Sequence, residues 1–291
     1  MSEHQDGPER RDWTGELGGM VEQVGGHRPP EIETSLPHSA RMYDYWLGGK
    51  TNFPADRALG EAFEQAIPSI RTMARENRAF LGRSVRYLVR EAGIRQFLDI
   101  GTGIPTEGNT HEVAQAEAVD SRVVYVDNDP IVLAHARALM VSGVAGRTAY
   151  LHADLREPER ILSHPALTGT LDVTRPVGLM LVAILMLLED EDDPWGKVRK
   201  LLDALPAGSH VAITHPSADF NPEAMGQVVA AAQQGRLTLV PRTREQVAEF
   251  FGDWELIEPG VVPVMGWHPD GAPPADPQAA YYWAGVARKR S

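Results

Sequence analysis

The chain has 291 residues, a formal net charge of -12 at pH 7 and no cysteine. This composition excludes disulfides, thiolate zinc sites and cysteine nucleophiles. The negative charge argues against duplex nucleic acid as a partner, because that association needs a basic face. The longest apolar run, residues 177–188, is shorter than the roughly 18 residues of a membrane helix, and no apolar signal segment follows the first methionine. We therefore expect a soluble cytoplasmic protein that does not act at a membrane.

The first part of the chain has two regions of different character. Residues 1–36 are rich in charge, glycine and proline, and we expect them to form a mostly disordered tail. Aromatic and charged side chains are then concentrated in residues 35–57. Apolar residues recur at helical spacing over residues 73–88, which predicts a long amphipathic helix. Together these patterns predict a helical cap over residues 37–95.

A glycine turn marks the start of the main domain, which we expect to cover residues 96–291. The turn Gly101 to Gly103 follows an apolar strand, and Asp99 stands two residues before it. The spacing is similar to a dinucleotide-binding turn, but Thr106 occupies the place of that motif's third glycine. A carboxylate beside the turn disfavours a pyrophosphate and suits an ammonium group. The turn therefore predicts a cofactor without phosphates, and S-adenosylmethionine carries both an ammonium and a sulfonium group.

Two further carboxylates end the next two predicted strands. Residues 123–126 are β-branched and aromatic, and Asp127 follows them where a βαβ unit presents an acid to a ribose diol. A third strand over residues 148–152 leads to Asp154, whose carboxylate can accept a hydrogen bond from an adenine amino group. Parallel strands end at one edge of a sheet, so the three strand ends predict a single cofactor site.

Strands and helices alternate through the rest of the chain, which is typical of a doubly wound parallel sheet. The apolar run at residues 177–188 predicts a central strand, and Asp193 predicts the cap of the helix that follows. A fifth strand is expected at residues 210–214. Two closing strands at residues 254–265 and 281–287 favour a sheet with one antiparallel edge over the all-parallel sheet of a dehydrogenase.

These features together resemble the class I S-adenosylmethionine-dependent methyltransferases. That resemblance implies an α/β, Rossmann-like sheet of seven strands in the order 3-2-1-4-5-7-6. Two blocks resemble one family within this class. The first is SARMYDYWLGGKTNFPADR at residues 39–57, and the second is LDIGTGIPTEGNTHEV at residues 98–113 together with VYVDNDP at residues 124–130. It is an S-adenosyl methyltransferase family abundant in actinobacteria and formerly labelled a domain of unknown function. The resemblance covers nearly everything after residue 35.

The resemblance implies a cofactor-binding set, part by part. The set comprises Asp99, Gly101, Thr102 and Gly103 around the methionine portion, Asp127 and Asn128 at the ribose, Asp154 and Leu155 at the adenine, and Ala183 on the fourth strand. Tyr43, with Tyr45 and Trp46 beside it, is expected to cover the cofactor, whose positive charge favours aromatic faces. The charged residues of the same segment, Arg41, Asp44, Asp56 and Arg57, are more readily explained as an internal ion-pair network.

No residue stands out as a general base. Many relatives have a histidine in the segment 184–187, where this chain has Met186, which cannot exchange a proton. The candidates for a catalytic group are Tyr43, His152 and His215, and each can equally be a packing residue. His111 is better explained by capping. The acids at residues 189–193 fit a solvated loop that caps the next helix, so we expect no metal site.

The sequence therefore predicts an S-adenosylmethionine-dependent methyltransferase that acts on an unidentified small molecule. Methyl transfer from a sulfonium is an in-line displacement, so positioning can supply most of the catalysis. Because of Met186, a catalytically inactive regulatory protein that binds S-adenosylmethionine or S-adenosylhomocysteine stays an alternative. A nicotinamide-dependent oxidoreductase is disfavoured by Thr106 and Asp99. Neither the methyl acceptor nor the oligomeric state follows from the sequence.

Overall fold

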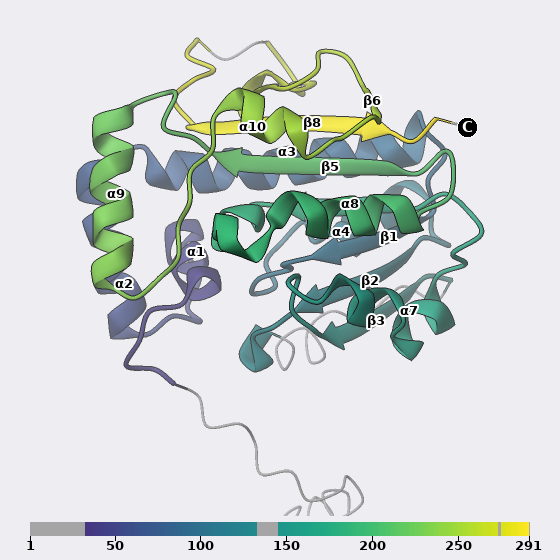
Figure 1. The fold of residues 1–291 in the computed structure, drawn as a ribbon, viewed down its shortest axis with the longest axis horizontal. Helices are drawn as coiled ribbons and strands as arrows, with labels where there is room; N and C mark the ends of the chain where they lie inside the picture. The colour runs from purple at the N-terminus through teal and green to yellow at the C-terminus, as the bar shows by residue number, and fades with distance from the viewer. Residues whose placement is uncertain (1–32, 133–144, 273–274, 291) are drawn as a thin grey trace, which may run out of the picture. The chain divides into compact units, whose positions relative to one another are not determined.

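The computed structural model describes residues 33–132, 145–272 and 275–290, so the predicted tail lies almost wholly outside the described residues. Within these ranges the strands form one sheet with helices on both faces (Figure 1). The strands are β1 (Gln96–Ile100), β2 (Arg122–Asp127), β3 (Arg147–His152), β4 (Gly178–Val182), β5 (His210–Pro216), β6 (Glu255–Leu256), β7 (Val262–Pro263) and β8 (Tyr282–Arg288).

In the described part of the chain, three helices precede the sheet, in the region predicted as a helical cap. In chain order the helices are α1 (Ser39–Leu47), α2 (Pro54–Ala66), α3 (Ile70–Arg90), α4 (Thr110–Glu117), α6 (Pro158–Leu162), α7 (Pro165–Thr170), α8 (Pro194–Ala204), α9 (Pro222–Gln234) and α10 (Arg244–Glu249). Three single turns of 3-10 helix are η1 (Leu185–Leu187), η2 (Asp190–Asp192) and η3 (Val264–Gly266). None of the described helices is both long enough and apolar enough to cross a membrane.

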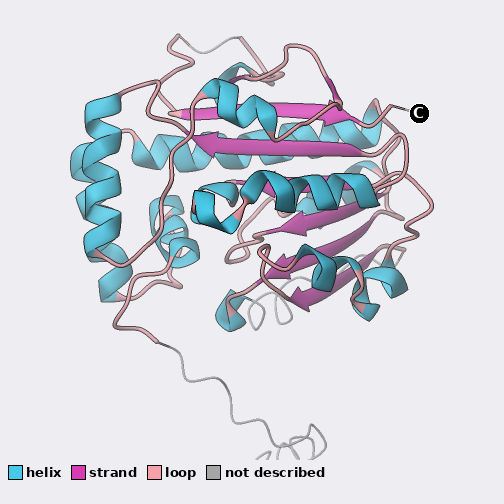
Figure 2. Cartoon of the chain, in the orientation of Figure 1, coloured by secondary structure: helices cyan, strands magenta, loops and turns pink. Residues whose placement is uncertain are grey.

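The strand order is β3-β2-β1-β4-β5-β8-β6, and β7 also pairs with β8. β1 to β5 are parallel, whereas β8 runs antiparallel to β5 (Figure 2). β6 and β7 both pair with β8, through Leu256 opposite Ala287 and Val262 opposite Ala284, so they are two short pieces of one edge. The predicted fold class and seven-strand order are confirmed, with the predicted sixth strand divided in two.

The predicted fourth strand was too long, because β4 ends at Val182 and not at Leu188. Ala183 has a φ of 54°, and its N–H donates to Thr214 Oγ1 at 2.9 Å. The chain then enters η1, in which Leu185 is fully buried and Met186 and Leu187 are half-buried. A buried turn and a buried strand have the same composition, so the apolar run alone could not separate them.

The two faces of the sheet are covered by different helices. Successive residues of a strand point to opposite faces, and Phe97 packs in one apolar cluster with Leu88 of α3, while Leu98 packs in the other with Val198 of α8. Figure 1 shows α1, α2 and α9 at the end of the sheet to which β1 to β5 point. The faces are therefore closed, and the carboxyl ends of the parallel strands are the part of the sheet where a ligand can approach.

Candidate functional site

The turn after β1 packs tightly on one side and is open on the other. Gly101 has a φ of 78°, and its N–H donates to Val126 O at 2.8 Å. A Cβ on Gly101 would lie 2.6 Å from the Ile184 side chain, so this position needs glycine. A Cβ on Gly103, whose φ is 67°, would meet no described atom within 4 Å. The first glycine lets the turn approach Ile184, just after β4, and the second borders open space.

Asp127, at the end of β2, is held in place by the glycine turn. Its Oδ2 accepts a hydrogen bond from Gly103 N–H, and its Oδ1 accepts one from Asp129 N–H, both at 2.9 Å. Burial raises the pKa of Asp127, and the two backbone hydrogen bonds oppose that rise. Each carboxylate oxygen can accept a second hydrogen bond. Asp127 is thus oriented by the backbone and still able to accept hydrogen bonds from hydroxyl groups.

Asp99, at the end of β1, is a second buried carboxylate on the same edge. Its Oδ2 accepts a hydrogen bond from Thr110 Oγ1 at 2.6 Å. Burial raises the pKa of Asp99 to about 6, the Thr110 hydrogen bond and the Arg78 guanidinium oppose this, and the nearby Asp127 adds to it. Asp99, Asp127 and Arg78 all line one pocket. This edge of the sheet therefore offers two buried acids and one guanidinium to a ligand.

A smaller hollow continues the pocket toward β3 and is lined by Asp154 and Leu155. Asn128 Nδ2 donates to Asp154 Oδ2, and Arg156 N–H donates to Asp154 Oδ1, both at 2.8 Å. Burial alone would raise the pKa of Asp154, but the hydrogen bonds from Arg156 and Asn128 outweigh it and lower the pKa. The hollow and the pocket share Asp127 and Asn128 in their walls, so they adjoin.

Helix α1 covers the pocket and is fixed to α3 through Tyr43. The Tyr43 hydroxyl donates to Ala74 O at 2.8 Å and accepts from Asn77 Nδ2 at 2.9 Å. Burial raises the pKa of Tyr43 to about 12. At the start of α1, His38 Nδ1 lies 3.3 Å from Asp129 Oδ2, which connects the helix to the loop after β2. The Tyr43 hydroxyl therefore keeps its proton and holds α1 in place, while the residue lines the pocket.

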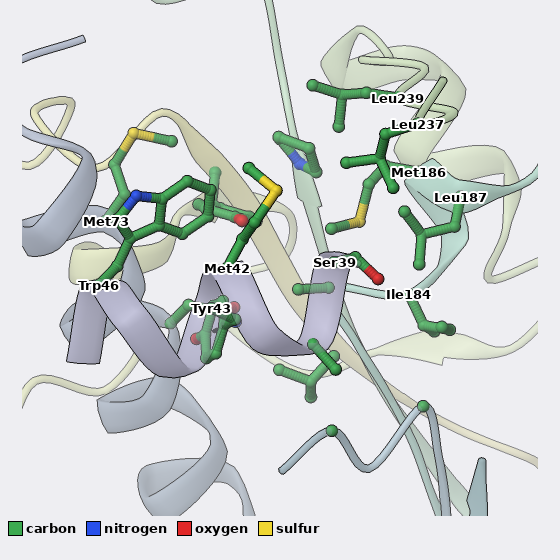
Figure 3. Close-up of a pocket in the computed structure, with 18 of the residues that line it drawn as sticks. Ser39, Met42, Tyr43, Trp46, Met73, Ile184, Met186, Leu187, Leu237 and Leu239 are labelled. Atoms are coloured by element: carbon green, nitrogen blue, oxygen red, sulfur yellow. Dashed lines mark hydrogen bonds between the residues drawn. The ribbon is translucent and has the colours of Figure 1, made fainter. Parts of the chain in front are cut away.

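Beyond the strand ends the pocket becomes apolar, and we call this part the apolar chamber. Its walls come from α1, α2, α3, α9 and the segment after α9, and include Trp46, Phe63, Met73, Met225, Val228 and Leu239. In Figure 3 Met42 lies between Trp46 and Met73 on one side and Met186, Leu187, Leu237 and Leu239 on the other. Ala183 also lines the pocket. The candidate site thus has a polar part at the strand ends and an apolar part under the helices.

Three histidines considered from the sequence do not line the pocket or the hollow. His152 is exposed, and its Nε2 lies 3.0 Å from Asn128 O. His215 is fully buried, its Nδ1 bonds to Pro216 O at 2.9 Å, and burial lowers its pKa to about 3. His111 is also buried and contacts the Tyr125 hydroxyl at 2.9 Å. His215 therefore lies away from the pocket, and His152 contacts Asn128 without lining the pocket itself.

Four charged side chains of the segment 39–57 form contacts within the helical region: Arg41, Asp44, Asp56 and Arg57. Arg41 forms an ion pair with the fully buried Asp56 at 3.0 Å. Asp44 accepts hydrogen bonds from Thr51 N–H at 2.9 Å and from Asn52 Nδ2 at 2.8 Å. Of the aromatic residues in this segment, Tyr43 and Trp46 line the pocket, whereas Tyr45 does not. The segment combines an internal polar network with two aromatic walls.

Two pocket residues on α3, Asn77 and Arg78, were not singled out from the sequence. Asn77 is 1% exposed, and among the described residues its Oδ1 has no hydrogen-bond partner. Arg78 donates to Glu107 O at 3.1 Å and lies close enough to Asp99 to lower its pKa. The sequence does contain one indication of Asn77: this residue interrupts the apolar stripe of the helix, and a buried polar residue needs a partner. That signal does not say what the partner is.

The acids after η1 are used in local structure. Asp193 accepts a hydrogen bond from Gly196 N–H at 3.1 Å and caps α8, as predicted. Arg242, which is almost fully buried, donates to Leu185 O and Leu188 O at 3.1 Å each and to Asp190 Oδ1 at 2.8 Å. Arg242 therefore holds the segment that carries Met186 into the pocket.

This strand order, with an antiparallel strand beside β5 and acids at the ends of β1 and β2, defines a Rossmann-like methyltransferase fold. The profile of a family described as S-adenosyl methyltransferase matches residues 26–290. The chain belongs to this S-adenosyl methyltransferase family.

Solved structures agree with that assignment. A DUF574 family protein from Streptomyces avermitilis is 47% identical, with a TM-score of 0.86 over 89% of this chain and 100% of its own. A protein from Thermobifida fusca, provisionally described as a methyltransferase, is 42% identical, with a TM-score of 0.81 over 90% of this chain and 98% of its own. The plantazolicin methyltransferase BpumL is 13% identical and covers 87% of this chain and 95% of its own; with a TM-score of 0.50, it shares the fold alone. A search of curated proteins found no match.

Proposed function

We propose that this chain is an enzyme that uses S-adenosylmethionine to methylate a small molecule. The observation that carries the proposal is the pair Asp99 and Asp127, two buried carboxylates that line one pocket beside the glycine turn. A buried carboxylate is costly without a partner of suitable charge or hydrogen-bonding capacity. A ligand with an ammonium group and a ribose diol would provide partners for both acids. Membership of the S-adenosyl methyltransferase family supports the same cofactor.

The pocket residues fit the parts of this cofactor by their chemistry. Asp127 would accept hydrogen bonds from the ribose hydroxyls, and Asp99 would accept from the ammonium group. Arg78, beside Asp99, would bind the carboxylate of the methionine portion. In the smaller hollow, Asp154 would accept from the adenine amino group while Leu155 contacts the ring.

The remaining proposed cofactor residues shape the space around these acids. Gly101 and Gly103 have no side chains, so the turn takes up little space, and Thr102 and Ala183 line the pocket beside them. Asn128 orients Asp154 through the hydrogen bond at 2.8 Å. Tyr43 forms the wall contributed by α1, where its ring can face a positively charged sulfur.

When bound, S-adenosylmethionine supplies a methyl group for in-line transfer to a nucleophile of the acceptor. The chain would contribute mainly by positioning the acceptor and excluding water. Tyr43 keeps its proton at neutral pH because burial raises its pKa to about 12, and Met186 has no proton to exchange. We therefore expect an acceptor whose nucleophile is reactive without a dedicated protein base, its proton, where it has one, passing to water.

The experiment is an assay for S-adenosylhomocysteine after incubation of the full chain with S-adenosylmethionine and a metabolite extract. We expect product above the level of an Asp127→Asn control. Cofactor binding without any product would favour the catalytically inactive binding protein, which Met186 keeps as the second candidate. An oxidoreductase is the weaker rival, because Thr106 replaces the third glycine and Asp99 would repel a pyrophosphate.

A further inference from the structure

The apolar chamber contains no charged side chain among its described residues. The acidic and basic residues that line the whole pocket are all near the strand ends. Asp99 and Asp127 lie at the ends of β1 and β2, Arg78 is close enough to Asp99 to lower its pKa, and His38 lies 3.3 Å from Asp129. A charged molecule in the chamber would lose its hydration and gain no partner there, which is unfavourable.

The two tyrosines that line the pocket, Tyr43 and Tyr282, keep their protons. Tyr43 already donates its hydroxyl hydrogen to Ala74 O, so that hydrogen is not available to a ligand. Burial raises the pKa of Tyr282, which also lines the pocket, well above its usual range. Neither tyrosine can therefore offer a negative charge to a cationic acceptor at neutral pH.

Asn77 carries a buried acceptor atom to which no described residue donates. Its Nδ2 donates to the Tyr43 hydroxyl at 2.9 Å, whereas its Oδ1, in a side chain 1% exposed, has no partner among the described residues. The opposite amide orientation would place Oδ1 against a hydroxyl whose hydrogen is already given to Ala74 O. The orientation is therefore determined by Tyr43, and Oδ1 stays a buried acceptor without a donor in the described part of the chain.

From these features we infer that the methyl acceptor is an uncharged, mainly apolar molecule that occupies the chamber and donates one N–H or O–H hydrogen bond to Asn77 Oδ1. This inference rests on the proposed function, because it describes the second substrate of the same pocket. Apolar burial against residues such as Trp46, Phe63 and Met225 supplies the affinity, and Asn77 supplies the specificity. Asn77 is thus a specificity residue for the acceptor.

Three naphthalene compounds provide a matched test. Their binding to the full chain is measured by equilibrium dialysis with saturating S-adenosylhomocysteine: 1-naphthol has an O–H donor, naphthalene has none, and 1-naphthoate carries a charge. We expect 1-naphthol to bind best and naphthalene about 2- to 10-fold more weakly, the range for one neutral hydrogen bond. 1-Naphthoate should bind at least about tenfold more weakly than 1-naphthol. Equal or tighter binding of the naphthoate would overturn the inference.

Variants connect the result to the named residues. Asn77→Leu should abolish the preference for 1-naphthol over naphthalene, and Leu239→Lys should weaken 1-naphthol at least about tenfold by placing a charge in the chamber. Leu256→Lys, at an exposed apolar position outside the pocket, is the matched control and should bind as the parent chain does. Retained binding of S-adenosylhomocysteine shows that each variant is folded. If Asn77→Leu does not fold, Asn77→Ala is used in its place.

The outcomes separate this inference from the proposed function. If the parent chain does not bind S-adenosylhomocysteine, the proposed function fails and the acceptor inference fails with it. If S-adenosylhomocysteine binds but 1-naphthol does not, only the acceptor inference fails. A weaker affinity of Asn77→Leu for S-adenosylhomocysteine, with the naphthol preference unchanged, would assign Asn77 to the cofactor and overturn its role in acceptor specificity.

Discussion

Gly103 N–H donates a hydrogen bond to Asp127 Oδ2 at 2.9 Å, so the turn after β1 and the acid at the end of β2 are directly connected. Asp127 Oδ1 is bonded in the same way to Asp129 N–H. Two backbone donors thus fix the carboxylate before any ligand binds. The arrangement is preorganised for hydroxyl groups, which reduces the ordering that binding requires.

The substitution Asp127→Asn tests this arrangement. An asparagine has one acceptor and one donor group, so it cannot satisfy both backbone N–H groups and it offers no charge to a diol. We expect the dissociation constant for S-adenosylmethionine to rise about 10- to 100-fold, the effect of losing hydrogen bonds to a charged group. Titration calorimetry measures it, with Asp253→Asn, at an exposed position, as the control. Unchanged affinity in Asp127→Asn would remove Asp127 from the cofactor site.

Asp99 predicts a pH dependence of cofactor affinity. Because burial raises the pKa of Asp99 to about 6, the group is protonated below that pH and a carboxylate above it. An ammonium group binds the carboxylate better, so affinity for S-adenosylmethionine should rise with pH, by about tenfold between pH 5 and pH 7, and then level off. In Asp99→Asn the rise should be largely lost. A dependence of opposite sign, or an identical rise in the variant, would show that Asp99 does not bind the ammonium group.

Tyr43 should contribute through its ring more than through its hydroxyl. Tyr43→Phe keeps the ring and removes the hydrogen bonds to Ala74 O and Asn77, whereas Tyr43→Ala removes both. We expect Tyr43→Ala to weaken S-adenosylmethionine about tenfold, since a cation beside an aromatic face gains about 0.5–2 kcal/mol, and Tyr43→Phe to weaken it about threefold or less. Calorimetry gives both values. If Tyr43→Ala binds as tightly as the parent chain, α1 covers the pocket without contacting the cofactor.

Arg242 should be important for stability because it holds the segment after β4. Arg242→Met would remove the hydrogen bonds to Leu185 O and Leu188 O and leave these carbonyl groups without that donor. We expect the free energy of unfolding to fall by about 2–4 kcal/mol. Asp190 is mainly exposed, so Asp190→Asn should cost less than about 1 kcal/mol. Urea unfolding compares the two, and equal losses would mean that the surface ion pair is the important contact.

The acids and glycines of the polar half can be predicted from the sequence because they depend on local rules, whereas Arg78 cannot. Asp99, the two glycines and Asp127 could be placed together because parallel strands end at one edge of a sheet. The cap of α8 at Asp193 likewise depends on neighbouring residues alone. These predictions needed only the order of strands and helices.

The apolar half could not be predicted, for a physical reason. Met225, Val228 and Leu239 have the same composition as core residues, and only the packing of α9 against α2 makes them the wall of a pocket. The predicted strand extends past Val182, where β4 ends, because the partly buried segment that follows is as apolar as a strand. Arg242 acts on carbonyl groups more than 50 residues away, a contact that no local pattern reveals.

The measurement that tests the central claim most directly is a pair of calorimetric titrations of the full chain, one with S-adenosylmethionine and one with NADH. The buried acids Asp99 and Asp127 predict saturable binding of S-adenosylmethionine with one site per chain, and no binding of NADH, whose pyrophosphate Asp99 would repel. Saturable binding of NADH, or no binding of S-adenosylmethionine, would contradict this account of the pocket.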